Sequence, residues 1–170
     1  QILRRIFKNR EERILQAMIV FLGVFGILSY LTVQRNLLFQ DTVALWTEEL
    51  HYRPDNARVH YNLGLAYFEK GNKPQAMKYY IQAAALRPDY AKAHNNIGNL
   101  FYEQGDKANA VAHYRTALAL NPLYAEAHNN YGVILMEAGS FKEALWHLQE
   151  TLRLQPGSLD TIRNLGNLYY

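Results

Sequence analysis

A period of 34 residues runs through the chain from Pro54 onward and constrains its fold more than any other feature. Residues 57–90, 91–124 and 125–158 align with no insertion. Glycine, asparagine, alanine and proline all recur at this spacing. The recurring residues are Gly64, Gly98, Gly132 and Gly166; Asn62, Asn96, Asn130 and Asn164; Ala76, Ala110 and Ala144; and Pro54, Pro88, Pro122 and Pro156. Such a period predicts an array of similar units that stack on one another.

Each unit combines small residues with helix breakers. We number its positions so that Gly64 stands at position 8 and Ala76 at position 20. Small side chains there allow two antiparallel helices to approach closely. Proline at position 32 stops a helix because it has no amide donor and clashes with the preceding turn. Gly71, Gly105 and Gly139 supply the left-handed freedom that the carboxy-terminal cap of a helix needs. Each unit is therefore predicted to be a helical hairpin.

The order of large and small positions resembles the tetratricopeptide repeat (TPR) family. That family has a large residue at position 4, Leu-Gly at 7 and 8, aromatics at 11 and 24, alanine at 20 and 27, and proline at 32. The first unit matches with His60, Leu63-Gly64, Tyr67, Ala76, Tyr80, Ala83 and Pro88. The third departs at Tyr131, Leu135, Leu148 and Thr151, all of which can still pack.

The resemblance implies an all-α fold, a right-handed solenoid of helical hairpins. Its three repeats occupy residues 57–90, 91–124 and 125–158. Residues 159–170 are expected to begin a further, truncated repeat. Residues 36–56 are expected to form a junction that contains a degenerate half repeat.

The amino-terminal segment has a different character. Residues 14–33 contain no ionisable side chain except the phenol of Tyr30. A helix of about 20 residues is about 30 Å long, the thickness of the hydrocarbon core of a bilayer. The run exceeds the roughly 7–15 apolar residues of a signal peptide, and a buried core helix of this length would need a larger surrounding globule. We therefore predict a transmembrane helix at residues 14–35.

Charge gives the orientation of this predicted span. The chain has 18 Lys and Arg against 15 Asp and Glu. Residues 1–35 hold six of the basic and two of the acidic residues, so the remainder is close to neutral. By the positive-inside rule, the basic flank 1–13 lies in the cytoplasm and the repeats lie in the periplasm of a bacterium or the lumen of a eukaryotic compartment. A near-neutral repeat body argues against nucleic-acid binding.

Asparagines and two basic residues mark a candidate peptide-binding groove. If the first helix of each hairpin lines the concave face, as the resemblance implies, positions 2, 5, 6, 9 and 13 face a ligand. The candidates are Asn62, Asn96, Asn130 and Asn164 at position 6; Asn95 and Asn129 at position 5; Asn99 and Asn167 at position 9; and Arg58 and Lys92 at position 2. Carboxamides both donate and accept, so a row of them can hold the backbone of an extended peptide.

This row resembles the asparagine-lined groove of O-GlcNAc transferase superhelices. The alternative is that the amides only make local hydrogen bonds within the repeats, and both interpretations stay open. A clamp for a terminal carboxylate is not expected, because the three repeats have no basic residue at position 5. Glu69, Glu103 and Glu137 at position 13 are expected to be solvated charges at the rim.

The sequence offers no catalytic constellation. It has no cysteine, which excludes thiolate metal sites and thiol nucleophiles. His60, His94 and His128 share position 4, but equivalent positions on stacked helices lie about 8–10 Å apart, too far for one metal ion. We expect those three to be packing residues, and His113 and His147 to be surface residues. We predict no catalytic residue, no metal and no cofactor.

A second resemblance lies at the junction. The stretches RNLLFQDTVALW (35–46) and PDNARVHYNLG (54–64) are similar to the membrane-to-repeat junction of transmembrane and TPR-containing O-mannosyltransferases and their bacterial relatives. In those enzymes many spans build a transfer site that uses a lipid-linked sugar, and the repeats lie outside the cytoplasm. Their acidic catalytic loop would lie upstream of Gln1, so no catalytic residue carries over.

Two functions fit these observations. The first is a membrane-anchored, non-enzymatic scaffold that binds proteins or extended peptides through the asparagine-lined groove outside the cytoplasm. The alternative is the carboxy-terminal, acceptor-binding part of a multi-span protein glycosyltransferase. For this chain we favour the scaffold, with no enzymatic activity of its own. Upstream apolar spans with an acidic luminal loop would favour the alternative.

Overall fold

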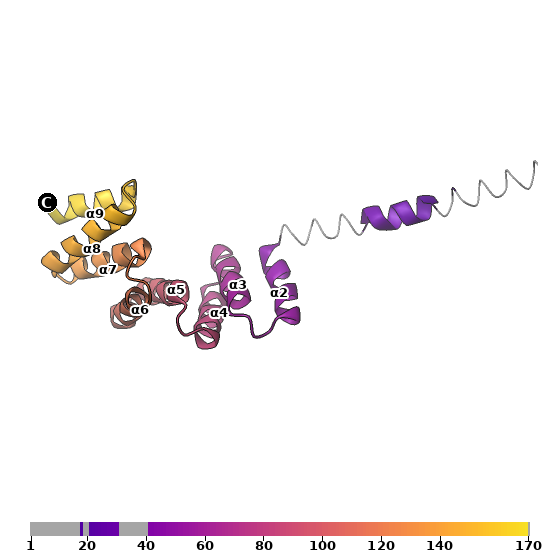
Figure 1. Ribbon diagram of the computed structural model, residues 1–170, viewed down its shortest axis with the longest axis horizontal. Coiled ribbons are helices and arrows are strands. Elements are labelled where there is room, and N and C mark those ends of the chain that lie inside the picture. The colour runs from indigo at the N-terminus through magenta and orange to yellow at the C-terminus, as the bar shows by residue number, and fades with distance from the viewer. Residues whose placement is uncertain (1–17, 19–20, 31–40, 170) are drawn as a thin grey trace, which may run out of the picture. The chain divides into compact units, whose positions relative to one another are not determined.

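The computed structural model describes residue 18, residues 21–30 and residues 41–169 (Figure 1). Residues 18 and 21–30 are helical, and their large apolar side chains are all more than half exposed. No helix in these described segments has the length and apolar character that crossing a bilayer requires. The basic flank 1–13, both ends of the predicted span over 14–35 and the first part of the junction lie outside the described residues.

The chain divides into two units, residues 1–45 and residues 46–170. The first helix with described bounds is α2, which covers Thr42–Tyr52. Its amino terminus is capped by Asp41, whose Oδ1 accepts from the amides of Val43 and Ala44 at 3.1 and 3.3 Å.

Three helical hairpins follow, each built from two antiparallel helices of similar length. The first helices are α3 (Ala57–Glu69), α5 (Ala91–Glu103) and α7 (Ala125–Glu137). Their partners are α4 (Lys73–Leu86), α6 (Lys107–Leu120) and α8 (Phe141–Leu154). The helix α9, Leu159–Tyr169, occupies the place of a fourth first helix.

Glycine and proline end these helices where the sequence predicts. Gly71, Gly105 and Gly139 follow the first helices with φ of +75°, +82° and +75°, a left-handed conformation that glycine adopts without strain. The second helices end two residues before Pro88, Pro122 and Pro156. The loop side chains of Asn72 and Asp106 cap the helices α4 and α6, whereas Ser140 makes no cap bond to α8.

A glycine at position 8 lets the two helices of a hairpin touch. A Cβ atom added at Gly64 would lie 2.6 Å from the ring of Tyr80, and one at Gly98 would lie 2.6 Å from the ring of Tyr114. Both tyrosines are 1% exposed. The side chain at position 24 therefore fills the space that the glycine leaves open.

Successive hairpins stack in sequence order (Figure 1). Helix α4 packs on α5, α6 on α7, and α8 on α9. On one face the first helices also touch, α5 with α7 and α7 with α9. The core lies partly between hairpins, because Tyr80 of α4 clusters with Ile97 and Leu100 of α5. For the described residues, the predicted all-α solenoid of stacked hairpins is confirmed.

Candidate functional site

Two adjoining cavities lie on the face formed mainly by the first helices. Their volumes are about 250 and 290 Å³. They share Phe68 of α3, Asn99 of α5 and Glu126 of α7, so they form one surface that crosses three hairpins. We call this surface the inner groove. Its remaining lining residues are Tyr61, Leu65, Tyr80 and Asn96 in the smaller cavity, and Tyr102, Glu103, Tyr114, Asn130 and Val133 in the larger.

Only some of the residues that the sequence suggested line the inner groove. Asn96, Asn99 and Asn130 do. The others line neither cavity: Asn62, Asn95, Asn129, Asn164, Asn167, Arg58 and Lys92. Asn95 is fully buried at 0% exposure, so a ligand has no access to it. A peptide-binding role for the accessible asparagines stays a prediction.

The asparagines bond one another across neighbouring repeats in a constant register. The amide at position 6 donates to the side chain at position 5 of the preceding repeat, 35 residues earlier. The three contacts are Asn96 Nδ2 to Tyr61 Oη at 3.3 Å, Asn130 Nδ2 to Asn95 Oδ1 at 3.2 Å, and Asn164 Nδ2 to Asn129 Oδ1 at 3.2 Å. The row of asparagines therefore ties first helices together.

Further hydrogen bonds engage the amides around α5. Asn130 Nδ2 also donates to Asn99 Oδ1 at 2.9 Å, and the same oxygen accepts from Tyr114 Oη at 2.8 Å. Asn95 Nδ2 donates to Glu126 Oε1 at 2.8 Å. The local hydrogen bonding that the sequence left open as an alternative is thus present in the structure.

Sequence reasoning missed the aromatic residues of the inner groove. Phe68 is 37% exposed and lines both cavities. Tyr102, at the equivalent position of the next repeat, lines the second cavity. A large side chain recurs there every 34 residues, as Phe68, Tyr102 and Met136, and this periodicity was the available signal. The lining of the inner groove therefore includes aromatic rings as well as amides.

The electrostatic character of the inner groove is acidic. Glu103 and Glu126 line it, and no Lys, Arg or His does so among the described lining residues. Burial raises the pKa of Tyr61 to about 12, with further contributions from Tyr90 and the charge of Glu126, against the lowering effect of its bond to Asn96. The pKa of Tyr114 is raised for the same main reason, with Glu126 and Glu103 among the lesser causes.

Ion pairs join the repeats at the rim. Lys73 Nζ lies 3.2 Å from Glu103 Oε2, and Lys107 Nζ lies 2.9 Å from Glu137 Oε2. Tyr102 Oη also donates to Glu137 Oε1 at 2.5 Å. The hydrogen bond from Tyr102 and the pairing with Lys107 lower the pKa of Glu137. Two of the position-13 acids therefore have cationic partners from the preceding repeat.

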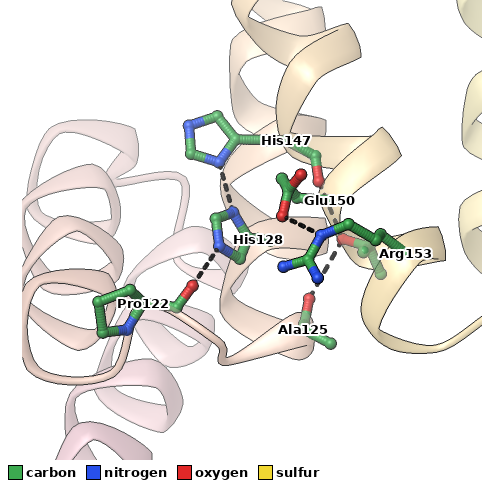
Figure 2. Close-up of polar contacts among 7 residues, drawn as sticks. Pro122, Ala125, His128, His147, Glu150 and Arg153 are labelled. Atoms are coloured by element: carbon green, nitrogen blue, oxygen red, sulfur yellow. Dashed lines mark hydrogen bonds and ion pairs between the residues drawn. The ribbon is translucent and has the colours of Figure 1, made fainter.

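The histidines at position 4 make two defined polar contacts each in the second and third repeats. Figure 2 shows His128 between the carbonyl of Pro122, at 3.0 Å, and the ring of His147, at 2.8 Å between the two Nδ1 atoms. In the second repeat His94 contacts the Pro88 carbonyl at 3.3 Å and His113 Nδ1 at 3.2 Å. Position 4 therefore links each hairpin to the loop before it.

We expected His113 and His147 to be surface residues, and this prediction was wrong. His147 is 7% exposed, and His113 is partly buried. The pairing at position 4 draws both rings inward. Burial, and then the nearby His128, lower the pKa of His147 to about 4, against a smaller opposing effect of Glu150. In the described part of the chain, no group of three His, Asp or Glu residues is arranged to hold a metal ion.

Comparison with known families decides what kind of repeat this is. One family model, described as tetratricopeptide repeat, matches residues 95–158, and a second, described as TPR repeat, matches residues 64–105. Together they span residues 64–158, more than half of the chain. The chain is a tetratricopeptide repeat protein. This fold typically serves as a non-enzymatic scaffold for protein interactions.

Solved structures share its fold. The structure of MamA has a TM-score of 0.67 and 22% identity, with 80% of each chain covered. The first TPR of Spaghetti (RPAP3), bound to the HSP90 peptide SRMEEVD, has a TM-score of 0.63 and 22% identity over 67% of this chain and 90% of that one. The Arabidopsis OM64 TPR domain has a TM-score of 0.62 and 19% identity over 66% and 93%.

No curated protein matches the chain significantly. The family and structural matches add no support to the resemblance with O-mannosyltransferases.

Proposed function

We propose that this TPR protein is a scaffold that holds an extended peptide segment of a partner protein in the inner groove. The observation that carries the proposal is the pair of cavities that share Phe68, Asn99 and Glu126. The two cavities adjoin across the first helices of three hairpins, and this arrangement suits successive side chains of an extended peptide. The HSP90 peptide on the structurally similar TPR of Spaghetti supports this mode.

The accessible groups of the inner groove suit a peptide main chain. Asn96 and Asn99 are only partly buried, and both line the smaller cavity. Carboxamides can donate to and accept from a peptide backbone. Phe68 and Tyr102 offer rings beside them for apolar side chains, and aromatic residues commonly anchor peptide interfaces.

A binding measurement on the full chain in detergent tests the proposal. The probe is an array of random decapeptides, acetylated at one end and amidated at the other. We expect Phe68→Ala to weaken the retained peptides at least about tenfold, because an anchor ring at the centre of an interface supplies much of its affinity. Ile81→Ala is the matched control, since Ile81 is 50% exposed and lines neither cavity. Failure of the array to retain any peptide would contradict the proposal.

We propose in addition that residues 14–33 anchor the repeats in a membrane. The apolar run and the exposed apolar side chains of residues 21–30 support an anchor. The flanking charges support a cytoplasmic location for residues 1–13 and a periplasmic or luminal location for the repeats. Protease added to sealed membrane vesicles of known orientation tests this arrangement. Alkaline extraction of the same membranes tests the anchor itself. Release of the chain by this extraction, or digestion of the repeats from the cytoplasmic side, would contradict the proposal.

A further inference from the structure

We propose that the inner groove selects a peptide segment carrying a lysine or arginine, whose cationic group pairs with Glu126 while its aliphatic stem lies on Phe68. This inference rests on the proposed peptide-binding function and names the chemistry of the partner. Glu126 and Phe68 belong to both cavities, so a side chain entering at their meeting point contacts both residues.

One acid of the inner groove has no cationic partner within the described part of the chain. Of its two acids, Glu103 already pairs with Lys73 at 3.2 Å. Glu126 has only neutral partners: Oε1 accepts from Asn95 at 2.8 Å, and Oε2 accepts from Tyr124 Oη at 3.2 Å. No Lys or Arg of the described residues forms an ion pair with it. Glu126 therefore presents an ion-pairing site to a ligand.

The neutral partners also hold this carboxylate in place. Asn95 is fully buried and is itself fixed by the amide of Asn130 at 3.2 Å. Tyr124, at the start of α7, contacts the other oxygen. A carboxylate fixed by two donors loses little conformational freedom when a guanidinium or ammonium group arrives, and charge-assisted hydrogen bonds are stronger than neutral ones.

The field of Glu126 reaches both cavities. Burial is the main cause of the raised pKa of Tyr61 and Tyr80, which line the smaller cavity, and of Tyr114, which lines the larger one. The charge of Glu126 raises all three pKa values further. The two basic residues predicted for the groove, Arg58 and Lys92, line neither cavity and form no ion pair with Glu126 among the described residues. A peptide carboxylate would meet repulsion in this field.

The aromatic wall suits the same side chain. Phe68 exposes 37% of its surface beside the acid. Lysine and arginine lie with their methylene stems on apolar surface and can place their charge near an aromatic ring. The groove thus offers a ring for the stem and an acid for the charge.

Three matched peptide pools test the selection on the full chain in detergent. The pools are capped decapeptides of random non-ionisable residues whose central residue is Arg, Gln or Glu. We expect the Arg pool to bind at least about tenfold more tightly than the Glu pool. We expect Glu126→Gln to reduce this preference about fivefold or more while keeping an oxygen acceptor for Asn95. Asp160→Asn is the matched control, because it removes one charge at the equivalent position of α9, outside both cavities.

The outcomes separate this inference from the function beneath it. Equal binding of the pools, a preference for Glu, or an Arg preference that survives Glu126→Gln would overturn the cationic selection and leave peptide binding standing. Failure of every pool to bind would overturn both. An equal loss in Asp160→Asn would assign the effect to net charge, and it would likewise overturn the role given to Glu126.

Discussion

Nδ1 of His147 lies 2.8 Å from Nδ1 of His128, inside the third hairpin (Figure 2). Nε2 of His128 faces the Pro122 carbonyl at 3.0 Å, and a carbonyl can only accept, so this nitrogen carries the proton. In neutral His128, Nδ1 is then the acceptor and Nδ1–H of His147 is the donor. The geometry satisfies two neutral rings, and two protonated rings would place hydrogens against each other.

Acid is therefore expected to destabilise the third hairpin. The pKa of His147 falls to about 4 in the folded chain, from 6.5 for an unperturbed histidine. Between these values the unfolded chain binds more protons than the folded chain, so stability is lost as the pH falls from about 6.5 toward 4. One such group predicts a loss of about 2 kcal/mol between pH 7 and pH 5. Thermal unfolding at both pH values measures it.

A tyrosine in place of His147 tests whether this histidine causes the loss of stability in acid. His147→Tyr copies Tyr79, which occupies this position in the first repeat, and is expected to flatten the pH dependence between pH 7 and pH 5. His51→Tyr, at an exposed position of α2, is expected to leave that dependence unchanged. An unaltered acid response in His147→Tyr would show that other groups cause it.

Alanine at two equivalent glycines is expected to have opposite effects. At Gly98 the new Cβ would lie 2.6 Å from the Tyr114 ring, an overlap that costs about 1–3 kcal/mol. At Gly166, in α9, an added Cβ would meet no atom within 4 Å apart from the local backbone of its own helix, so the better helix propensity of alanine should stabilise the helix by up to about 1 kcal/mol. Chemical denaturation measures both variants. Equal effects of the two would contradict the proposed fit between positions 8 and 24.

The hairpins could be predicted from sequence because their determinants are local. Gly98 and Tyr114 stand 16 residues apart within one repeat, and the same spacing recurs at Gly64 and Tyr80. Gly71 ends a helix by its own backbone conformation. Such features repeat with the period and depend little on how one repeat sits on the next.

The groove could not be predicted as well, because its geometry depends on the rotation between repeats. Asn130 reaches Asn95, 35 residues earlier, and Glu126 reaches the same amide from 31 residues away. Neither spacing is the repeat period, and both arise only from stacking. The sequence located the polar face, but stacking decided that Asn95 would be buried and that Glu126 would line both cavities.

The caps of two equivalent helices predict unequal effects of alanine. Asn72 Oδ1 accepts from the amide of Gln75 at 3.3 Å at the start of α4, whereas Ser140 makes no such bond to α8. Asn72→Ala should cost about 1 kcal/mol of stability, the usual value for a lost helix cap. Ser140→Ala should change stability little. Hydrogen exchange of amides in the first turns of α4 and α8 would reveal the difference, and similar losses in both would argue against the cap.

Asn130 is expected to stabilise the stack of repeats whatever it does for a ligand. Asn130→Ala removes the donor from Asn95 Oδ1 and Asn99 Oδ1, and Asn95 is fully buried. An unsatisfied buried acceptor costs about 1–3 kcal/mol. Asn62→Ala is the control, because Asn62 makes no side-chain hydrogen bond to any described residue and should change stability by less than about 0.5 kcal/mol.

Hydrogen exchange in α5 and α7 distinguishes this structural role from ligand binding. Because a repeat array is stabilised by contacts between neighbours, loss of the Asn130 bonds should speed exchange in α5 and α7 more than in α3. Helix content by circular dichroism should stay unchanged. If Asn130→Ala instead abolished peptide binding with exchange unaltered, the amide would serve the ligand and the hydrogen bonds to Asn95 and Asn99 would contribute little to stability.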